Sequence, residues 1–339
     1  NWDIARRRLE LPTATLTASS LSAQAERVVV VLPAQGALEM QATLGYRGDL
    51  GRLQQWMTDP NDPSDWQTSG QCSGSAELQS AEGRTAGRIE ATIEGFAASH
   101  RSGQQLREPR IQLAAAGTYD AAGRALVLDR AEVVSGSLGV RLAGEIATPD
   151  ASPRLQLAGQ FDYDMEKLSE LLIPYVGDGV RFLGRGSRPA SWQGPPMPGE
   201  AQAATGVGWE LGNVYGFRLG RGALRASLSG GMVSFEPVET TLSEGRLQLA
   251  GQLRLTPEPR ELYLAPGPVA QQVRINPQMC AAVLQYVAPV LAGVATAEGR
   301  FSIELDRCRI PLDHPSQSEL AGRMTVHSVR VGPGPLIHE

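Results

Sequence analysis

A strand pattern with a glycine at a fixed place recurs along this chain. In "GRLQLAGQLRL" (245–255), leucines alternate with arginine or glutamine, and a glycine stands near the middle. "GVRLAGEI" (139–146) and "PRLQLAGQF" (153–161) repeat the same order of residue types. Alternation with period two places the apolar side chains on one face of a β-strand. The chain is therefore predicted to form many strands that are apolar on one side and polar on the other.

The three repeats supply the candidate residues of an apolar groove. They are Val140, Leu142, Ile146, Leu155, Leu157, Phe161, Leu247, Leu249, Leu253 and Leu255. Gly144, Gly159 and Gly251 fall on the same face, where a missing side chain permits a bulge, strong curvature or the close approach of another group. Curvature repeated at matching places is what a sheet needs in order to wrap.

Helical periodicity is predicted in only three places, near 49–57, 164–176 and 277–291. In the last two, apolar residues recur at intervals of three and four, which gives one apolar stripe. Asp164 and Asn276 stand where an N-cap is expected, and the shorter helical pattern follows Asp49. The sequence thus predicts a mainly β protein: an extended, curved antiparallel sheet with two or three short amphipathic helices inserted between strands.

The strands and helices suggest two regions. Strand-rich modules are predicted over 1–199 and a further module over 200–339, with the proline- and glycine-rich stretch 184–206 as the boundary. The chain begins without Met, and both of its ends read as mid-structure. We therefore expect a piece of a longer protein, with any membrane anchor or signal outside this segment.

Charge and composition exclude some classes of partner. The chain has 31 Lys and Arg against 36 Asp and Glu, a formal net charge of -5, so it lacks the basic stripe that nucleic acids require. Only 5% of the residues are aromatic and 38 are glycine, which favours thin strands and turns over a bulky core. No uninterrupted apolar run of about 18 residues is present, so no bilayer-spanning helix is predicted.

No motif for catalysis or metal binding stands out. "GQCSG" (70–74) fits the form of a thiol nucleophile elbow, but an elbow must join a strand to a helix, and the surrounding residues predict a polar turn instead. The histidines lack metal-ligand spacing, and the carboxylates are scattered. We therefore predict a protein that is not an enzyme, with no metal and no cofactor. A polysaccharide hydrolase stays as a minor alternative that would need two carboxylates brought together.

Three cysteines, Cys72, Cys280 and Cys308, are widely spaced and form no CxxC pair. Neither a zinc site nor a disulfide framework follows from this spacing. A bridge between Cys280 and Cys308 stays open.

One segment carries a family resemblance. The stretch 215–255 reads as strand, turn, strand, "GG" turn, strand and a closing strand that begins with glycine. It is similar to the C-terminal segment of the AsmA-like proteins, relatives of TamB and of the repeating β-groove lipid-transfer group. Gly222 to Leu224 match the opening strand, Gly230 and Gly231 the hairpin turn, Met232 to Phe235 the next strand, and Gly245 and Gly251 the recurring glycines. The likeness covers about 200–339 and continues only as rhythm over 30–200.

The resemblance implies an envelope protein of bacteria with two membranes. Such a protein is periplasmic and tethered to the inner membrane, and it binds or conducts phospholipid acyl chains for outer-membrane biogenesis or assembly. It has no catalytic residues to carry over. This segment departs from the family in showing no anchor, which leaves its membrane attachment in doubt.

A rival reading uses the same strands without a lipid. In it the apolar faces pack against each other in a β-sandwich, and the protein is a structural or protein-interaction module of the envelope. Alternation fits both readings, so the deciding feature is whether the apolar faces are covered by protein.

Overall fold

The structure, a computed structural model, describes residues 2–3, 7–32, 39–58, 65–101, 105–148, 152–275 and 295–333. In these ranges, 22 strands belong to one sheet, and each pair with a defined register is antiparallel. Two short α-helices interrupt the strands, α1 (Leu50–Met57) and α2 (Met165–Val176). The predicted class, a mainly β antiparallel sheet with short inserted helices, is confirmed.

The described residues fall into two compact units. The first comprises 1–162 and 189–196, and the second comprises 163–188 and 197–339. The strands of the first unit are β1 (Trp2–Asp3), β2 (Arg8–Thr17), β3 (Leu21–Val31), β4 (Glu39–Asp49), β5 (Trp66–Ala81), β6 (Arg84–His100), β7 (Gln105–Asp120), β8 (Ala125–Val134), β9 (Leu138–Ala147), most of β10 (Arg154–Asp164) and the second half of β12 (Arg185–Gly194).

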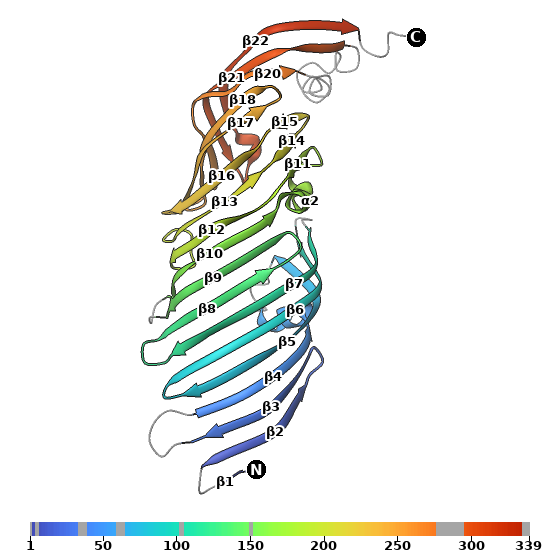
Figure 1. Cartoon of the computed structure of the whole chain (residues 1–339). Helices are drawn as coiled ribbons and strands as arrows, with labels where there is room; N and C mark the ends of the chain where they lie inside the picture. The colour runs from blue at the N-terminus through green and yellow to red at the C-terminus, as the bar shows by residue number, and fades with distance from the viewer. Residues whose placement is uncertain are drawn as a thin grey trace. The chain divides into compact units, whose positions relative to one another are not determined.

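Strand order in the first unit follows the chain. Each strand from β2 to β9 pairs with the strand before it and the strand after it, and β10 pairs with β9 and β12, as Figure 1 shows. Strands β5 to β7 are 16 or 17 residues long, and a tight turn links β5 to β6. The turn between β5 and β6 contains Gly83, whose φ of 78° lies in the left-handed region that favours glycine.

The two helices begin where the sequence predicts. The Asp49 side chain accepts a hydrogen bond from the Arg52 backbone N–H at 3.0 Å, which satisfies a free donor at the start of α1. Asp164 accepts in the same way from the Glu166 N–H at 3.2 Å at the start of α2. The helix predicted near 277–291 lies outside the described residues.

Helix α1 is fastened to the start of β5 through one glutamine. The Gln54 side-chain nitrogen donates to the Trp66 carbonyl oxygen at 2.6 Å, and its oxygen accepts from the Thr68 N–H at 2.7 Å. The helix lies behind the strands in the view of Figure 1. Leu53 lies beside Gly48, so α1 covers the side of the sheet toward which Gly48 points.

The remaining strands belong to the second unit. They are β11 (Val180–Leu183), the first half of β12, β13 (Gln202–Trp209), β14 (Leu211–Val214), β15 (Phe217–Leu219), β16 (Gly222–Ser229), β17 (Met232–Leu242), β18 (Gly245–Arg254), β19 (Glu261–Leu264), β20 (Gly267–Ile275), β21 (Ala295–Pro311) and β22 (Glu319–Pro333), with a short 3-10 helix at Pro315–Gln317.

Pairing in the second unit departs from chain order. Strand β13 pairs with β16, and β11 pairs with β14. Short strands β19 and β20 lie one after the other between β18 and β21, and each pairs with both of them. The hairpin predicted at Gly230 and Gly231 joins β16 to β17, and both glycines have positive φ.

A hydrophobic core forms in the second unit. Its buried members are Leu219, Leu242, Ala270, Val273 and Phe301. Val273 has no exposed surface, and the rings of Phe217 and Phe301 meet edge to face with centroids 6.3 Å apart. Residues from β15, β17, β20 and β21 therefore pack side chain against side chain in this unit.

One sequence prediction about an irregular segment is wrong. Residues 70–74, predicted as a polar turn, lie inside β5, where Gly70 takes a φ of 141° at a register shift toward β6. The stretch 184–206, predicted as a boundary, contains β12 and the start of β13, and the two units change over within it, at 188/189 and at 196/197. Prolines and glycines occur within these strands because single bulges and edge positions tolerate them. The division into modules over 1–199 and 200–339 stays a prediction.

Candidate functional site

Cross-strand pairing aligns the apolar residues of the first unit in rows. One row crosses six strands at Leu44, Ala76, Ile89, Ala115, Ala131 and Leu142. A second runs in parallel through Tyr46, Gly74, Ala91, Leu113, Val133 and Val140. Directly paired residues point to the same side of a sheet, so these rows share one face. We call this surface the apolar face of the first unit.

The apolar face is covered by protein only near α1. Ile93 and Ala98 are buried. Farther along the strands, Ile89 is 45% exposed, and Leu78 and Val133 are exposed as well. Among the described residues of this unit, α1 is the one element other than neighbouring strands that packs substantially on a strand. Most of the face is therefore a single layer that no second sheet covers.

Six of the predicted groove residues lie at the β9 and β10 end of this face. Val140, Leu142 and Ile146 pair with apolar residues of β8. Leu155, Leu157 and Phe161 alternate along β10 in the same way. All six are half-buried: they pack against side neighbours, but nothing buries them completely.

The other four predicted residues lie in the second unit, and their surroundings differ. Leu247 packs against the core around Val273 and Phe301. Leu249 pairs with the buried Val238, and Leu253 pairs with Val233 and Leu262. Leu255 follows the last residue of β18. The side chain of Leu247 is therefore covered by other side chains of this protein, as the β-sandwich alternative requires.

The recurring glycines are explained by the close approach of neighbouring strands. A side chain at Gly144 would collide with the Gln156 carbonyl oxygen, and one at Gly159 with the Arg141 carbonyl oxygen. Gly251 also stands close to a carbonyl oxygen, that of Tyr263, but less tightly than the other two glycines. Of the three reasons that the sequence allowed for these glycines, close approach of backbone applies to all three, and register shifts also lie beside Gly144 and Gly251.

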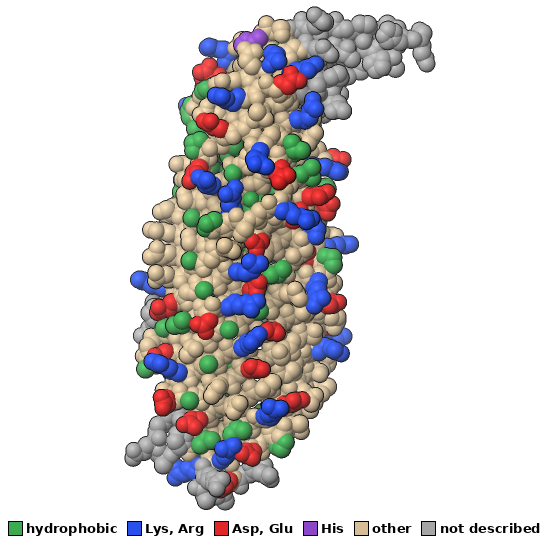
Figure 2. Space-filling model, viewed as in Figure 1, with side chains coloured by type: hydrophobic (Ala, Val, Ile, Leu, Met, Phe, Trp, Pro, Cys, Tyr) green, Lys and Arg blue, Asp and Glu red, His purple; other side chains and the backbone are tan. Residues whose placement is uncertain are grey.

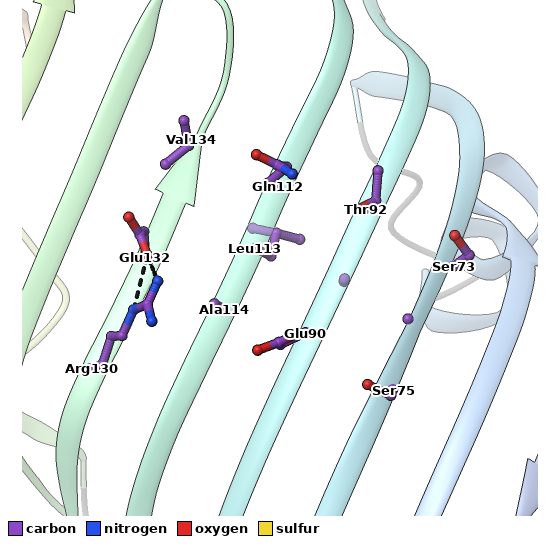
Figure 3. A pocket seen from close by; sticks show the side chains of 12 residues that line it. Ser73, Ser75, Glu90, Thr92, Gln112, Leu113, Ala114, Arg130, Glu132 and Val134 are labelled. Atoms are coloured by element: carbon purple, nitrogen blue, oxygen red, sulfur yellow. Dashed lines mark hydrogen bonds and ion pairs between the residues drawn. The ribbon is translucent and has the colours of Figure 1, made fainter.

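The opposite face of the first unit is polar. Figure 2 shows acidic and basic side chains in alternation along its middle. Arg88 pairs with Glu90 at 2.6 Å, and Arg141 pairs with Glu132 at 2.9 Å. Between these pairs lies a hollow of about 510 Å³, drawn in Figure 3. Its side chains come from β5 to β8 and include Ser73, Ser75, Glu90, Thr92, Gln112, Arg130 and Glu132.

Two carboxylates flank Ala114 in this hollow and are the pair to consider for the hydrolase alternative. Glu90 of β6 and Glu132 of β8 each pair directly with Ala114 of β7. Each carboxylate is bound by arginine, and hydrogen bonds from Arg130 and Arg141 lower the pKa of Glu132. A general acid needs a raised pKa, so Glu132 is poorly suited to donate a proton.

A buried carboxylate stands out in the second unit. Glu261 has no exposed surface and accepts hydrogen bonds from the side chains of Arg254, Tyr263 and Arg309, the Arg309 Nε lying 2.9 Å away. These donors lower the pKa of Glu261, the Tyr263 hydroxyl most and Arg309 next. Because all of its partners belong to β18, β19 and β21, the cluster ties these three strands together.

The described ranges contain no group of three or more side chains arranged to bind a metal ion. None of the helices in those ranges has the length and apolar character needed to cross a bilayer. Among the described residues, Cys72 and Cys308 form no disulfide. Cys280 lies outside the described residues, so the bridge between Cys280 and Cys308 stays open.

Sequence reasoning missed most of the apolar face outside β9 and β10. Leu44, Tyr46 and Leu78 alternate less regularly with polar residues than the leucines of the repeats do. The sequence did contain one clear signal for this face. In "RIEATIEGF", the apolar residues Ile89, Ala91 and Ile93 alternate strictly with polar residues, and they lie at the centre of the face. Pairing across strands, rather than any single strand, identifies the surface.

In comparisons with protein-family models, curated proteins and solved structures, none matches this chain significantly.

Proposed function

We propose that this chain is an AsmA-like envelope protein whose first unit binds phospholipid acyl chains on its apolar face. The observation that carries the proposal is the uncovered row from Leu44 to Leu142, which crosses six strands without a polar side chain. An aliphatic surface of this kind favours aliphatic ligands, because each methylene removed from water contributes about 0.8 kcal/mol.

Small residues make the face suitable for extended chains. Three of the six residues in the first row and four of the six in the second are no larger than valine, and Gly87 pairs with Gly117 across β6 and β7. No aromatic stack interrupts the row from Leu44 to Leu142. A flat ligand such as a sterol would gain little from this surface, whereas a flexible acyl chain can lie along it.

The cellular setting of the proposal comes from the family resemblance. A periplasmic location, an inner-membrane tether outside this segment and a role in outer-membrane biogenesis are what AsmA-like proteins imply. The four predicted residues of the second unit are the less favourable part of the groove, because Leu247 already packs against protein. The first unit is therefore the better place to test lipid binding.

The test is a charge placed on the apolar face. Ile89→Asp should lower lipid retention at least about tenfold, since a tenfold loss needs only about 1.4 kcal/mol. Lipid co-purifying with the protein is quantified by extraction and mass spectrometry, and crosslinking to a photoactivatable phospholipid gives a second measure.

The matched control is Val127→Asp. Val127 is 49% exposed, about as much as Ile89, but it pairs with Thr118 and Glu145 on the polar face. Equal losses from both variants, or full retention by a folded Ile89→Asp protein, would contradict the proposal. Wild-type protein that carries and binds no lipid at all would do so as well.

A further inference from the structure

The hollow on the polar face of the first unit, which we call the polar hollow, collects side chains with unused hydrogen-bonding groups (Figure 3). Four uncharged polar side chains line it and bond to no other described residue: Ser73, Ser75, Thr92 and Gln112. Thr92 pairs with Ser73 on one side and with Gln112 on the other, so these three form a row across β5, β6 and β7. Ser75 lies in the next row, opposite Glu90. The four free groups therefore point into one space.

Charged side chains of the polar hollow also keep bonding capacity. Both hydrogen bonds from Arg88 reach Oε1 of Glu90, at 3.2 and 2.6 Å, and no described residue bonds to Oε2. Arg130 uses Nε and Nη2 for Glu132, and its Nη1 bonds to no described residue. The polar hollow thus offers a free acceptor on β6 and a free donor on β8, with the uncharged groups beside them.

Ala114 forms the floor of the polar hollow. It lies directly between Glu90 of β6 and Glu132 of β8, and its methyl group is much shorter than either side chain. The space above it is about 510 Å³, which lies within the range of roughly 300–1,000 Å³ that ligand sites occupy. A ligand can therefore approach the sheet here and meet polar groups from four neighbouring strands.

The mixture of free groups determines which ligand fits. The carboxylates of Glu90 and Glu132 disfavour an anion, and the guanidinium of Arg130 disfavours a cation. An apolar ligand would displace water from the free polar groups without replacing its hydrogen bonds, which is costly. A hydroxyl group both donates and accepts, so a ligand rich in hydroxyls can satisfy donors and acceptors together.

We propose that the polar hollow binds a neutral oligosaccharide, which lies across β5 to β8. Neighbouring strands are about 4.8 Å apart, so an extended sugar chain that crosses them meets a new polar side chain at each strand. The contacts are open to water, so weak binding is expected. The site lies on the face opposite to the apolar face, so it does not depend on lipid binding.

The first test is a titration with defined sugars, followed by NMR of the backbone amides. Chitohexaose, cellohexaose and maltohexaose are the neutral probes, at concentrations up to the millimolar range. The fully deacetylated chitosan hexamer and hexagalacturonate are the cationic and anionic probes. At least one neutral probe should shift the amide signals around Thr92 and Gln112 in a saturable way, and both charged probes should bind at least about fivefold more weakly.

The second test removes the free groups or fills the space. Thr92→Val combined with Gln112→Ala should weaken binding at least about fivefold, because two hydrogen-bonding side chains are lost. Gln79→Ala is the matched control, since Gln79 lies on the same face of β5 but outside the polar hollow. Ala114→Ile should weaken binding at least about tenfold by filling the space, whereas Thr118→Ile, on the same face of β7, should not.

Amide spectra of each variant show whether it is folded. In folded proteins, the absence of a saturable shift with every neutral probe, or equal binding of neutral and charged probes, would overturn the proposal. Equal losses from the test variants and their controls would do so as well, and so would saturable shifts confined to strands other than β5 to β8. Shortening of the probe during the titration would indicate a hydrolase instead.

Discussion

The two units use the same alternating strands with different outcomes. In the first unit, Ile89 stands at the centre of an apolar face and is almost half exposed. In the second unit, Val273 and Phe301 come from strands of the same type and are buried in a core. Strand order accounts for the difference, because strands that pair only with their chain neighbours build one layer, whereas the out-of-order pairing of β11 to β21 brings apolar side chains together. Alternation alone thus specifies an apolar face but not what covers it.

The largest expected effect is a difference in the cost of truncating apolar side chains. Phe301→Ala should destabilise the second unit by about 3–5 kcal/mol, because it leaves a cavity in a packed core. Ile89→Ala in the first unit should cost less than about 1.5 kcal/mol, because its side chain is only partly removed from water. Chemical denaturation of the lipid-free protein measures both. Similar losses of stability in the two variants would mean that Ile89 is covered in solution as Phe301 is, and the two units would then not differ in this respect.

A smaller loss of stability is expected from adding a side chain where β9 and β10 approach each other closely. Gly144 has a φ of 145°, and a side chain there would meet the Gln156 carbonyl oxygen, so Gly144→Ala should cost about 1–3 kcal/mol. Gly83→Ala is the control, since Gly83 also has positive φ but open space around it. Thermal unfolding should rank Gly144→Ala as the less stable variant. The reverse ranking would show that β9 and β10 do not approach as closely as described.

The smallest effect is a pH dependence confined to the second unit. The pKa of Glu261 is lowered by its hydrogen bonds from Tyr263 and Arg309, so the carboxylate stabilises the folded state fully above its unfolded pKa of about 4.3. That contribution is lost as the pH falls through the lower folded pKa. Glu261→Gln should therefore lower the unfolding temperature at pH 7 and have progressively less effect as the pH is brought below 4.

The control for Glu261 is an exposed ion pair. Glu236 lies 3.1 Å from Arg225, and both side chains are largely exposed, so Glu236→Gln should change stability little at any pH. If the effect of Glu261→Gln were the same at pH 7 and at acidic pH, ionisation of the buried carboxylate would not be its cause.

Much of the fold could be predicted from local pattern. The alternation at 139–146, 153–161 and 245–255 gives β9, β10 and β18, and the helical patterns near 49–57 and 164–176, the second with its cap Asp164, give the two described helices. These features depend on a few adjacent residues, which is why one sequence suffices to find them. The strand at 70–74 was missed because Gly70 there lies at a register shift instead of ending the strand.

The candidate site was less predictable, because it depends on pairing between distant strands. Leu142 and Leu247 look alike in sequence, yet one lies on the uncovered face and the other packs against Val273. No local pattern distinguishes them, since the difference arises from which strands become neighbours. The buried Glu261 was missed for the same reason, because its partner Arg309 is 48 residues away along the chain.

The strictly sequential pairing in the first unit has an evolutionary consequence. Since each strand from β2 to β9 is bonded only to the strands before and after it, duplicating or deleting one hairpin would leave every other pairing intact. Each such event would alter the span of the sheet by about 10 Å, twice the spacing between strands. Homologues could therefore differ in the span of this sheet through changes in gene length alone.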